Sequence, residues 1–128
     1  MTNGEKEINM AKVFIGTEIK LNINIEPIGN QTMDDFPFDV LIIGGVGGRK
    51  KSKTFSKKGD GENITLTPGL KRGDDSNNYI VAFNTSDIGI GKVICRIVAH
   101  LDDGDFSDRK RTEITEINTG IEVINGSI

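Results

Sequence analysis

The residues best suited to nucleophilic or acid–base chemistry are the single histidine, His100, and the single cysteine, Cys95. A catalytic dyad or triad requires the imidazole within hydrogen-bonding distance of the thiol or of a serine hydroxyl. The two positions are five residues apart, and side chains of a β-strand alternate between its faces. A strand across this segment therefore directs them to opposite faces. No carboxylate pair is singled out by its spacing either, so we predict no catalytic residues and no enzyme activity.

An acidic segment, Asp102–Asp108 (DDGDFSD), is the best candidate for a metal site. Calcium binds several oxygen ligands supplied by a short loop. The segment lacks the EF-hand order, in which acids at alternate positions precede a glycine and a distal glutamate. We expect a solvated hairpin loop and no metal, and we interpret Asp34-Asp35 and Asp74-Asp75 in the same way.

Glycines at Gly44–Gly48 (GGVGG) follow an apolar segment, as in some phosphate-binding turns. Neither GxGxxG nor GxxxxGK[ST] is present, and no helical pattern follows to supply a helix N-terminus. We therefore expect a bend or bulge at the end of a strand, and no bound cofactor.

A basic cluster is the strongest local charge feature. It comprises Arg49, Lys50, Lys51, Lys53, Lys57 and Lys58. Nucleic acid is not the expected partner, because the formal net charge is −3 and only Phe55 could stack on a base. The cluster could instead dock on an acidic protein surface, where charges steer association. A solvated edge loop is the alternative interpretation.

The elements that would position these residues are β-strands. The segment Thr17–Glu26 alternates between isoleucine or leucine and polar residues, which predicts a strand. Within Thr85–Val123 we predict a long strand, a polar loop and a returning strand. The apolar face of the outgoing strand comprises Val93, Cys95, Ile97, Ala99 and Leu101. A single apolar face is typical of a half-buried antiparallel strand, and we expect this face to form the floor of the core.

Turn signals every 8–12 residues and the absence of a helical period predict an all-β fold. Further strands are expected at Ile8–Ile15, Phe38–Val46, around Phe55, at Asn63–Thr67 and at Asn78–Asn84. The pattern is typical of an antiparallel Ig-like β-sandwich of about seven to nine strands; a jelly roll or a small barrel remains an alternative. We assign residues 1–7 to an N-terminal arm, 8–124 to the sandwich and 125–128 to a C-terminal tail.

The composition fits one domain of 128 residues. No run approaches the roughly 18 apolar residues of a membrane span, so no membrane association is expected. The segment MTNGEKEINM lacks the apolar core of a signal peptide. A single cysteine cannot form an intrachain disulfide, and we expect Cys95 to pack as a small hydrophobic residue.

The closing part of the chain resembles a known family. A Gly turn that ends in Gly-Lys-Val (Asp87–Val93) leads into a long strand, which is followed by an Asp-rich loop (Leu101–Asp108). Arg-Thr-Glu (Arg111–Glu113) and Thr-Gly-Ile (Thr119–Ile121) come after the loop. Together with the opening Val13-Phe14-Ile15-Gly16, this arrangement is similar to Ig-like β-sandwich domains of virion proteins in tailed bacteriophages, including crAss-like phages of Bacteroides-type bacteria.

The resemblance implies an auxiliary capsid protein, the base of a head fibre, or an adaptor of the tail or baseplate. Many such relatives carry further domains, and the 128-residue length favours a free-standing decoration or joining protein. We therefore expect a structural protein that is made in the bacterial host cytoplasm and resides in the virion. It would bind the major capsid protein or other virion proteins, in many copies per particle.

The expected contacts are a polar arm (Thr2–Glu7), the basic cluster and the acidic loop, because loops on a rigid scaffold commonly carry binding residues. In the acidic loop the candidates are Asp102, Asp103 and Asp105. A tail or baseplate adaptor and a glycan- or ligand-binding module are the alternatives. The absence of Trp and the single Tyr disfavour glycan binding, which commonly uses exposed aromatic rings.

Overall fold

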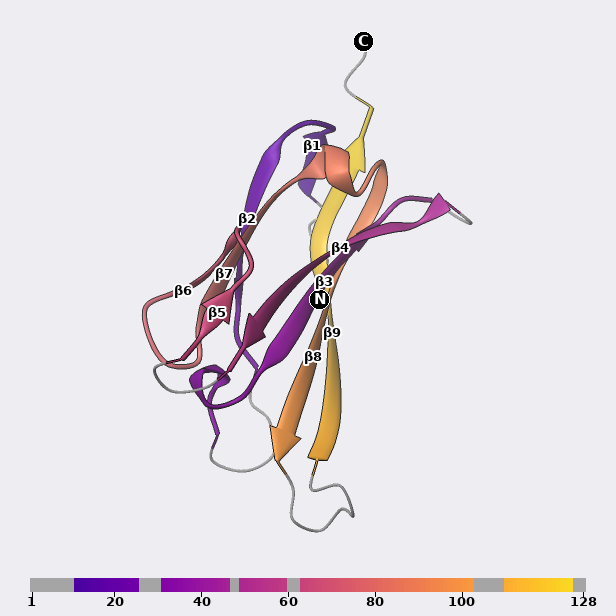
Figure 1. Cartoon of the computed structure of the whole chain (residues 1–128). Coiled ribbons are helices and arrows are strands. Elements are labelled where there is room, and N and C mark those ends of the chain that lie inside the picture. Colours follow the sequence, from indigo (N-terminus) through magenta and orange to yellow (C-terminus); the bar gives the residue numbers. More distant parts are fainter. Residues whose placement is uncertain (1–10, 26–30, 47–48, 60–62, 103–109, 126–128) are drawn as a thin grey trace, which may run out of the picture.

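The computed structural model describes residues 11–25, 31–46, 49–59, 63–102 and 110–125. In these residues the chain forms nine β-strands and two short 3₁₀ turns, η1 (Met33–Asp35) and η3 (Thr85–Asp87), as Figure 1 shows. The strands are β1 (Ala11–Phe14), β2 (Glu18–Ile23), β3 (Phe38–Gly44), β4 (Lys51–Lys58), β5 (Thr65–Leu66), β6 (Leu70–Arg72), β7 (Tyr79–Asn84), β8 (Gly91–Asp102) and β9 (Lys110–Ile124). The expected arm at residues 1–7 lies outside the described residues.

Two sheets pack face to face. One has the order β1-β9-β8-β3-β4-β5 and the other has the order β2-β7-β6. In immunoglobulin nomenclature β9-β8-β3-β4-β5 correspond to G-F-C-C′-C″, with β1 added beside G, and β2-β7-β6 correspond to B-E-D, the division found in variable-type domains. The prediction of an all-β, Ig-like sandwich with seven to nine strands is therefore confirmed.

One pairing differs from the expected antiparallel arrangement. Strand β1 runs parallel to the end of β9, with Ala11 opposite Ile121 and Phe14 opposite Ile124. The cause is the turn after β1, where Thr17 N–H donates to the Phe14 carbonyl at 3.1 Å and the chain crosses to the other sheet. Since β1 and β2 lie in different sheets, β1 does not form a hairpin with β2 and instead joins the strand that ends beside it.

The core lies between β8 and β3 on one side and β2 and β7 on the other. The predicted apolar face of β8 is buried along its whole length, from Val93 to Leu101. Across the core it faces β7, whose Val81 is fully buried, and Ile23 of β2. Burying one such side chain contributes about 1.5–3 kcal/mol. Because alternation places these side chains on one face of each strand, burying them requires the two sheets to pack face to face.

Strand β9 contains a bulge. Its register with β8 shifts between Val93 and Ile94, which pair with Ile121 and Asn118. Gly120 in this bulge has φ 73°, a conformation that glycine adopts without strain. Ile117 before the bulge and Ile121 after it both lie on the inner face, opposite Cys95 and Val93. Ile114, by contrast, lies on the outer face and is 64% exposed.

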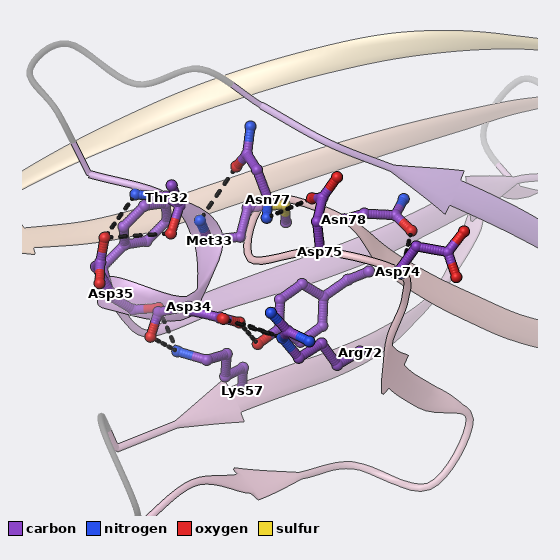
Figure 2. Close-up of polar contacts among 12 residues, drawn as sticks. Thr32, Met33, Asp34, Asp35, Lys57, Arg72, Asp74, Asp75, Asn77 and Asn78 are labelled. Atoms are coloured by element: carbon purple, nitrogen blue, oxygen red, sulfur yellow. Dashed lines mark hydrogen bonds and ion pairs between the residues drawn. The ribbon is translucent and has the colours of Figure 1, made fainter.

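A polar network joins η1 to β6 and β7 at one end of the sandwich (Figure 2). The Asp34 carboxylate accepts hydrogen bonds from Arg72 Nε (2.9 and 3.1 Å) and from the Tyr79 hydroxyl (2.6 Å). Burial, followed by the hydrogen bond and charge of Asp34, raises the pKa of Tyr79 above its usual range. Asp34 is therefore not the solvated loop residue that we expected; it ties three elements together.

Replacing Asp34 with alanine should destabilise the fold by about 1–3 kcal/mol, because the buried Tyr79 hydroxyl loses its acceptor. Chemical denaturation of the two proteins measures this difference in unfolding free energy. Asp74→Ala is the matched control, since the exposed Asp74 lies in the neighbouring turn, and it should change stability by less than about 0.5 kcal/mol. Equal effects of the two substitutions would contradict the role given to Asp34.

Candidate functional site

Large hydrophobic side chains are exposed mainly at one end of the sandwich. Four of the five such residues among the described parts of the chain lie there, at the end of β1 or in the turns: Phe14 (55% exposed), Ile15 (38%), Val46 (64%) and Ile90 (42%). Figure 1 shows the end of β1, the β3–β4 turn and η3 at this end, where β9 also terminates. Scattered exposed hydrophobic residues are common, but their concentration at one end of a domain is a feature of interaction sites. We call these four residues the apolar end.

Sheet pairing and glycine turns bring these segments together. Phe14 is beside Ile124 and Gly91 is beside Val123, so β1 and the start of β8 flank the end of β9. At Gly91 (φ 133°) an added Cβ would lie 2.4 Å from the Gly45 carbonyl oxygen and 3.3 Å from the Val46 side chain. The two turns approach this closely because residue 91 is a glycine, whereas a Cβ at Gly45 would collide with Arg49 and Lys50 of its own turn.

A shallow hollow of about 440 Å³ lies beside Val46. It is lined by Ile43, Gly44, Gly45, Val46, Lys50, Gly91, Lys92, Ile94 and Glu122. Its wall is mostly aliphatic, with two lysines and one glutamate at polar positions. Among the described residues neither Lys50 nor Lys92 forms an ion pair.

The basic cluster predicted from sequence is not a single surface. Arg49, Lys50 and Lys51 are exposed at the turn into β4, next to the apolar end. Lys58 is exposed at the other end of β4. Lys53 forms an ion pair with Asp87 of η3 at 2.8 Å and lies 5.6 Å from the centre of the Phe55 ring.

Lys57 is a correction to the predicted contact set. Its side chain is 1% exposed, and its ammonium donates to the carbonyl oxygens of Phe36 (2.8 Å) and Asp34 (3.2 Å). It also lies 5.7 Å from the centre of the Phe38 ring. Lys57 points inward because it occupies the same face of β4 as the buried Phe55. It is a structural residue and cannot contact a partner in the folded chain.

Of the acidic candidates, Asp102 alone belongs to the described residues. Asp102 is the last residue of β8, opposite Lys110 of β9. Asp103 and Asp105 lie outside the described residues. In the part of the chain that is described, no three His, Cys, Asp or Glu side chains gather in a way that could hold a metal ion.

One polar cluster combines residue types used in catalysis. His100 Nε2 lies 3.0 Å from Asp39 Oδ2, and the Ser56 hydroxyl donates to Asp39 Oδ1 at 2.5 Å. The carboxylate therefore stands between serine and histidine, whereas a serine nucleophile requires the histidine beside it. Burial raises the pKa of Asp39, but hydrogen bonds from His100 and Ser56 outweigh this effect and lower it overall. Such a carboxylate is a weak base.

Cys95 offers no reactive thiol. It is 1% exposed on the inner face of β8, and burial raises its pKa to about 11, so it is protonated and inaccessible near pH 7. The prediction that Cys95 and His100 lie on opposite faces is confirmed.

Sequence reasoning missed the apolar end, although a signal was present. Each of its turns places a hydrophobic residue directly beside glycine: Ile15-Gly16, Gly45-Val46 and Gly89-Ile90-Gly91. Glycines with positive φ at positions 16, 45, 89 and 91 end the regular strand geometry there, so the neighbouring hydrophobic residue is carried away from the core.

Comparisons with known proteins give a likeness in structure and none in sequence. No family model and no curated protein matches the chain. One similar solved structure is that of the extracellular domains of the voltage-gated sodium channel beta4 subunit, described as parallel homodimers that explain its role in cell–cell adhesion. The TM-score is 0.41 at 10% identity, over 98% of this chain and 100% of that chain. A similarity of this size carries no argument about function. Within the described residues, no helix is long and apolar enough to span a bilayer.

The Asp39 cluster predicts a pH dependence of stability. Because the pKa of Asp39 is lower in the folded chain than its ordinary value of 3.8, the ionised form stabilises the fold above about pH 4, and this stabilisation is lost as the pH falls through the folded-state pKa. Measured from pH 7 to pH 2, the unfolding free energy of Asp39→Asn should fall less steeply below about pH 4 than that of the wild type. Parallel curves would contradict this assignment.

Proposed function

We propose that this chain is a non-enzymatic structural protein of a phage particle, most specifically an auxiliary subunit that decorates the capsid shell or anchors a head fibre. The observation that carries the proposal of a docking role is the apolar end with its lysine-rimmed hollow. The assignment to a phage particle comes from the resemblance described above.

The apolar end supports protein docking. Val46 and Ile90 lie in turns and Phe14 ends strand β1 of a rigid sandwich, so little conformational entropy is lost when a partner covers them. An apolar centre surrounded by polar groups is the usual composition of a protein interface.

The charges favour an acidic partner surface. Arg49, Lys50 and Lys51 adjoin the hollow, and Lys92 lies within its lining. Glu122 is the one acidic residue of that lining. Cations at the rim raise the association rate with a negative surface and contribute less to the final affinity than the buried apolar contacts. Binding should therefore weaken as salt increases.

Replacing Val46 with lysine should weaken binding to particles at least about tenfold, because a charge would be buried against an apolar contact. The assay is co-sedimentation of purified protein with particles that lack it, followed by quantification of the bound protein. Thr54→Lys is the matched control: it adds the same charge at an exposed position on the outer face of β4, and it should bind like the wild type.

A double substitution, Lys50→Glu with Lys92→Glu, should slow association and remove most of its salt dependence. Stopped-flow or surface-based kinetics at two ionic strengths would measure both effects. If the double variant associates as fast as the wild type, the partner surface is not acidic.

Mass spectrometry and electron cryomicroscopy of purified virions decide the location. A decoration protein is present in many copies over the shell, whereas a tail or baseplate adaptor is present in a few copies at one vertex. Absence of the protein from purified particles would overturn the proposal.

A further inference from the structure

Among the described residues, no strand pairs with a long stretch of the outer edge of β9. Its residues pair with β8 on one side, while β1 covers the other side only at Ile121–Ile124. Along Thr112–Asn118 no strand formed by the described residues lies on that other side. An edge of this length, whose outward backbone N–H and C=O groups have no partner strand among the described residues, is a template for another strand.

The other edges of the sandwich are short or carry charge. Strands β5 and β6 have two and three residues, and β1 has four. The uncovered part of β4 carries the exposed Lys51 and Lys53, and β2 carries the exposed Glu18 and Lys20. Lysine and short length are the usual means of preventing edge-to-edge association. Between Thr112 and Asn118, β9 contains no lysine, no proline and no bulge.

The acidic groups of this stretch are neutralised within the chain. Glu116 pairs with Arg96 of β8 at 2.8 Å, and Glu113 pairs with Arg111 at 3.0 Å. Ile114 lies between them with 64% of its surface exposed. The edge therefore presents an apolar centre and no uncompensated charge to an approaching strand.

We propose that this edge pairs with the same edge of a second copy, antiparallel about a two-fold axis that passes through Ile114. Two copies of one strand edge can pair symmetrically only when antiparallel. With Ile114 on the axis, the two Ile114 side chains meet, Glu113 faces Thr115 of the other copy, and Thr112 faces Glu116 of the other copy. No like charges stand directly opposite each other in this register.

The neighbouring registers are less favourable. An axis through Glu113 or Glu116 places two identical carboxylates side by side, which is destabilising in a sheet. An axis through Thr115 places the exposed Ile114 against a carboxylate. Of the registers centred on Glu113, Ile114, Thr115 and Glu116, the pattern of the edge therefore favours the one centred on Ile114. This interface is separate from the apolar end, so the inference stands independently of the proposed function.

A pair of seven-residue strands is a small interface, below the roughly 1,200 Å² of standard complexes, so the dimer should be weak and depend on concentration. Sedimentation equilibrium up to about 1 mM protein, the range of weak complexes, should show a monomer–dimer equilibrium. Ile114→Lys should raise the dissociation constant at least about tenfold, because it brings two ammonium groups together on the axis. Val46→Lys, at an equally exposed position, should leave the equilibrium unchanged.

Cysteine cross-linking tests the register directly. Under mild oxidation Ile114→Cys should form a disulfide-linked dimer. Thr112→Cys and Glu116→Cys should each fail to cross-link alone and should cross-link when mixed. The wild type is the control for the native thiol, because Cys95 is buried.

Three outcomes would overturn the inference. The first is a protein that stays monomeric over the whole concentration range. This result overturns the inference even if the amides of Thr112–Asn118 are protected from hydrogen exchange by residues of the same chain. The second is a dimer that is lost in Val46→Lys and retained in Ile114→Lys, which would place the interface at the apolar end. The third is equal cross-linking at all three cysteine positions, which indicates random collision.

Discussion

The hydrogen bonds around Asp34 and Lys57 are the constraint on which one end of the sandwich depends. The Asp34 carboxylate accepts hydrogen bonds from Arg72 and Tyr79, and the backbone carbonyl of Asp34 accepts one from the Lys57 ammonium. These contacts join η1, β4, β6 and β7, which belong to both sheets. Because a buried hydroxyl or ammonium without a partner costs several times more than a hydrogen bond contributes, these groups hold each other in a single arrangement, and the loop that carries η1 is fixed with them.

The two ends of the sandwich are therefore closed by different physical means. At the Asp34 end, polar side chains satisfy one another across the sheets. At the opposite end, glycine turns allow a close approach of backbone to backbone, as between Gly45 and Gly91, and the Lys53–Asp87 ion pair links β4 to η3. Glycine turns bring no side chains of their own to cover the neighbouring residues. The hydrophobic residues beside them stay exposed, and this end becomes the candidate for docking.

Two surfaces of different character result. The apolar end combines exposed hydrophobic side chains with a hollow whose lining includes Lys50 and Lys92, and it is suited to a partner of another kind. The β9 edge offers mainly backbone groups around Ile114 and is suited to a strand. A protein that binds one partner through the apolar end and a second copy through the β9 edge can bind as a dimer. The two copies then contact the partner together, and two weak contacts made together bind far more strongly than either alone. His100 and Cys95 belong to neither surface, because His100 binds the Asp39 carboxylate and Cys95 is buried.

The sequence by itself determined the fold class, the course of the long strands and the burial of one face of β8, because alternation with a period of two is a local property of the chain. It also placed Cys95 and His100 on opposite faces. It did not determine which side chains become structural or exposed. Lys57 and Lys50 belong to the same basic run, yet one is buried under η1 and the other lines a hollow, because different turns lie beside them. Asp34, Val46 and Ile114 acquire their roles in the same way. Those roles depend on which segments, distant in sequence, pack against each strand, and only the tertiary structure decides that.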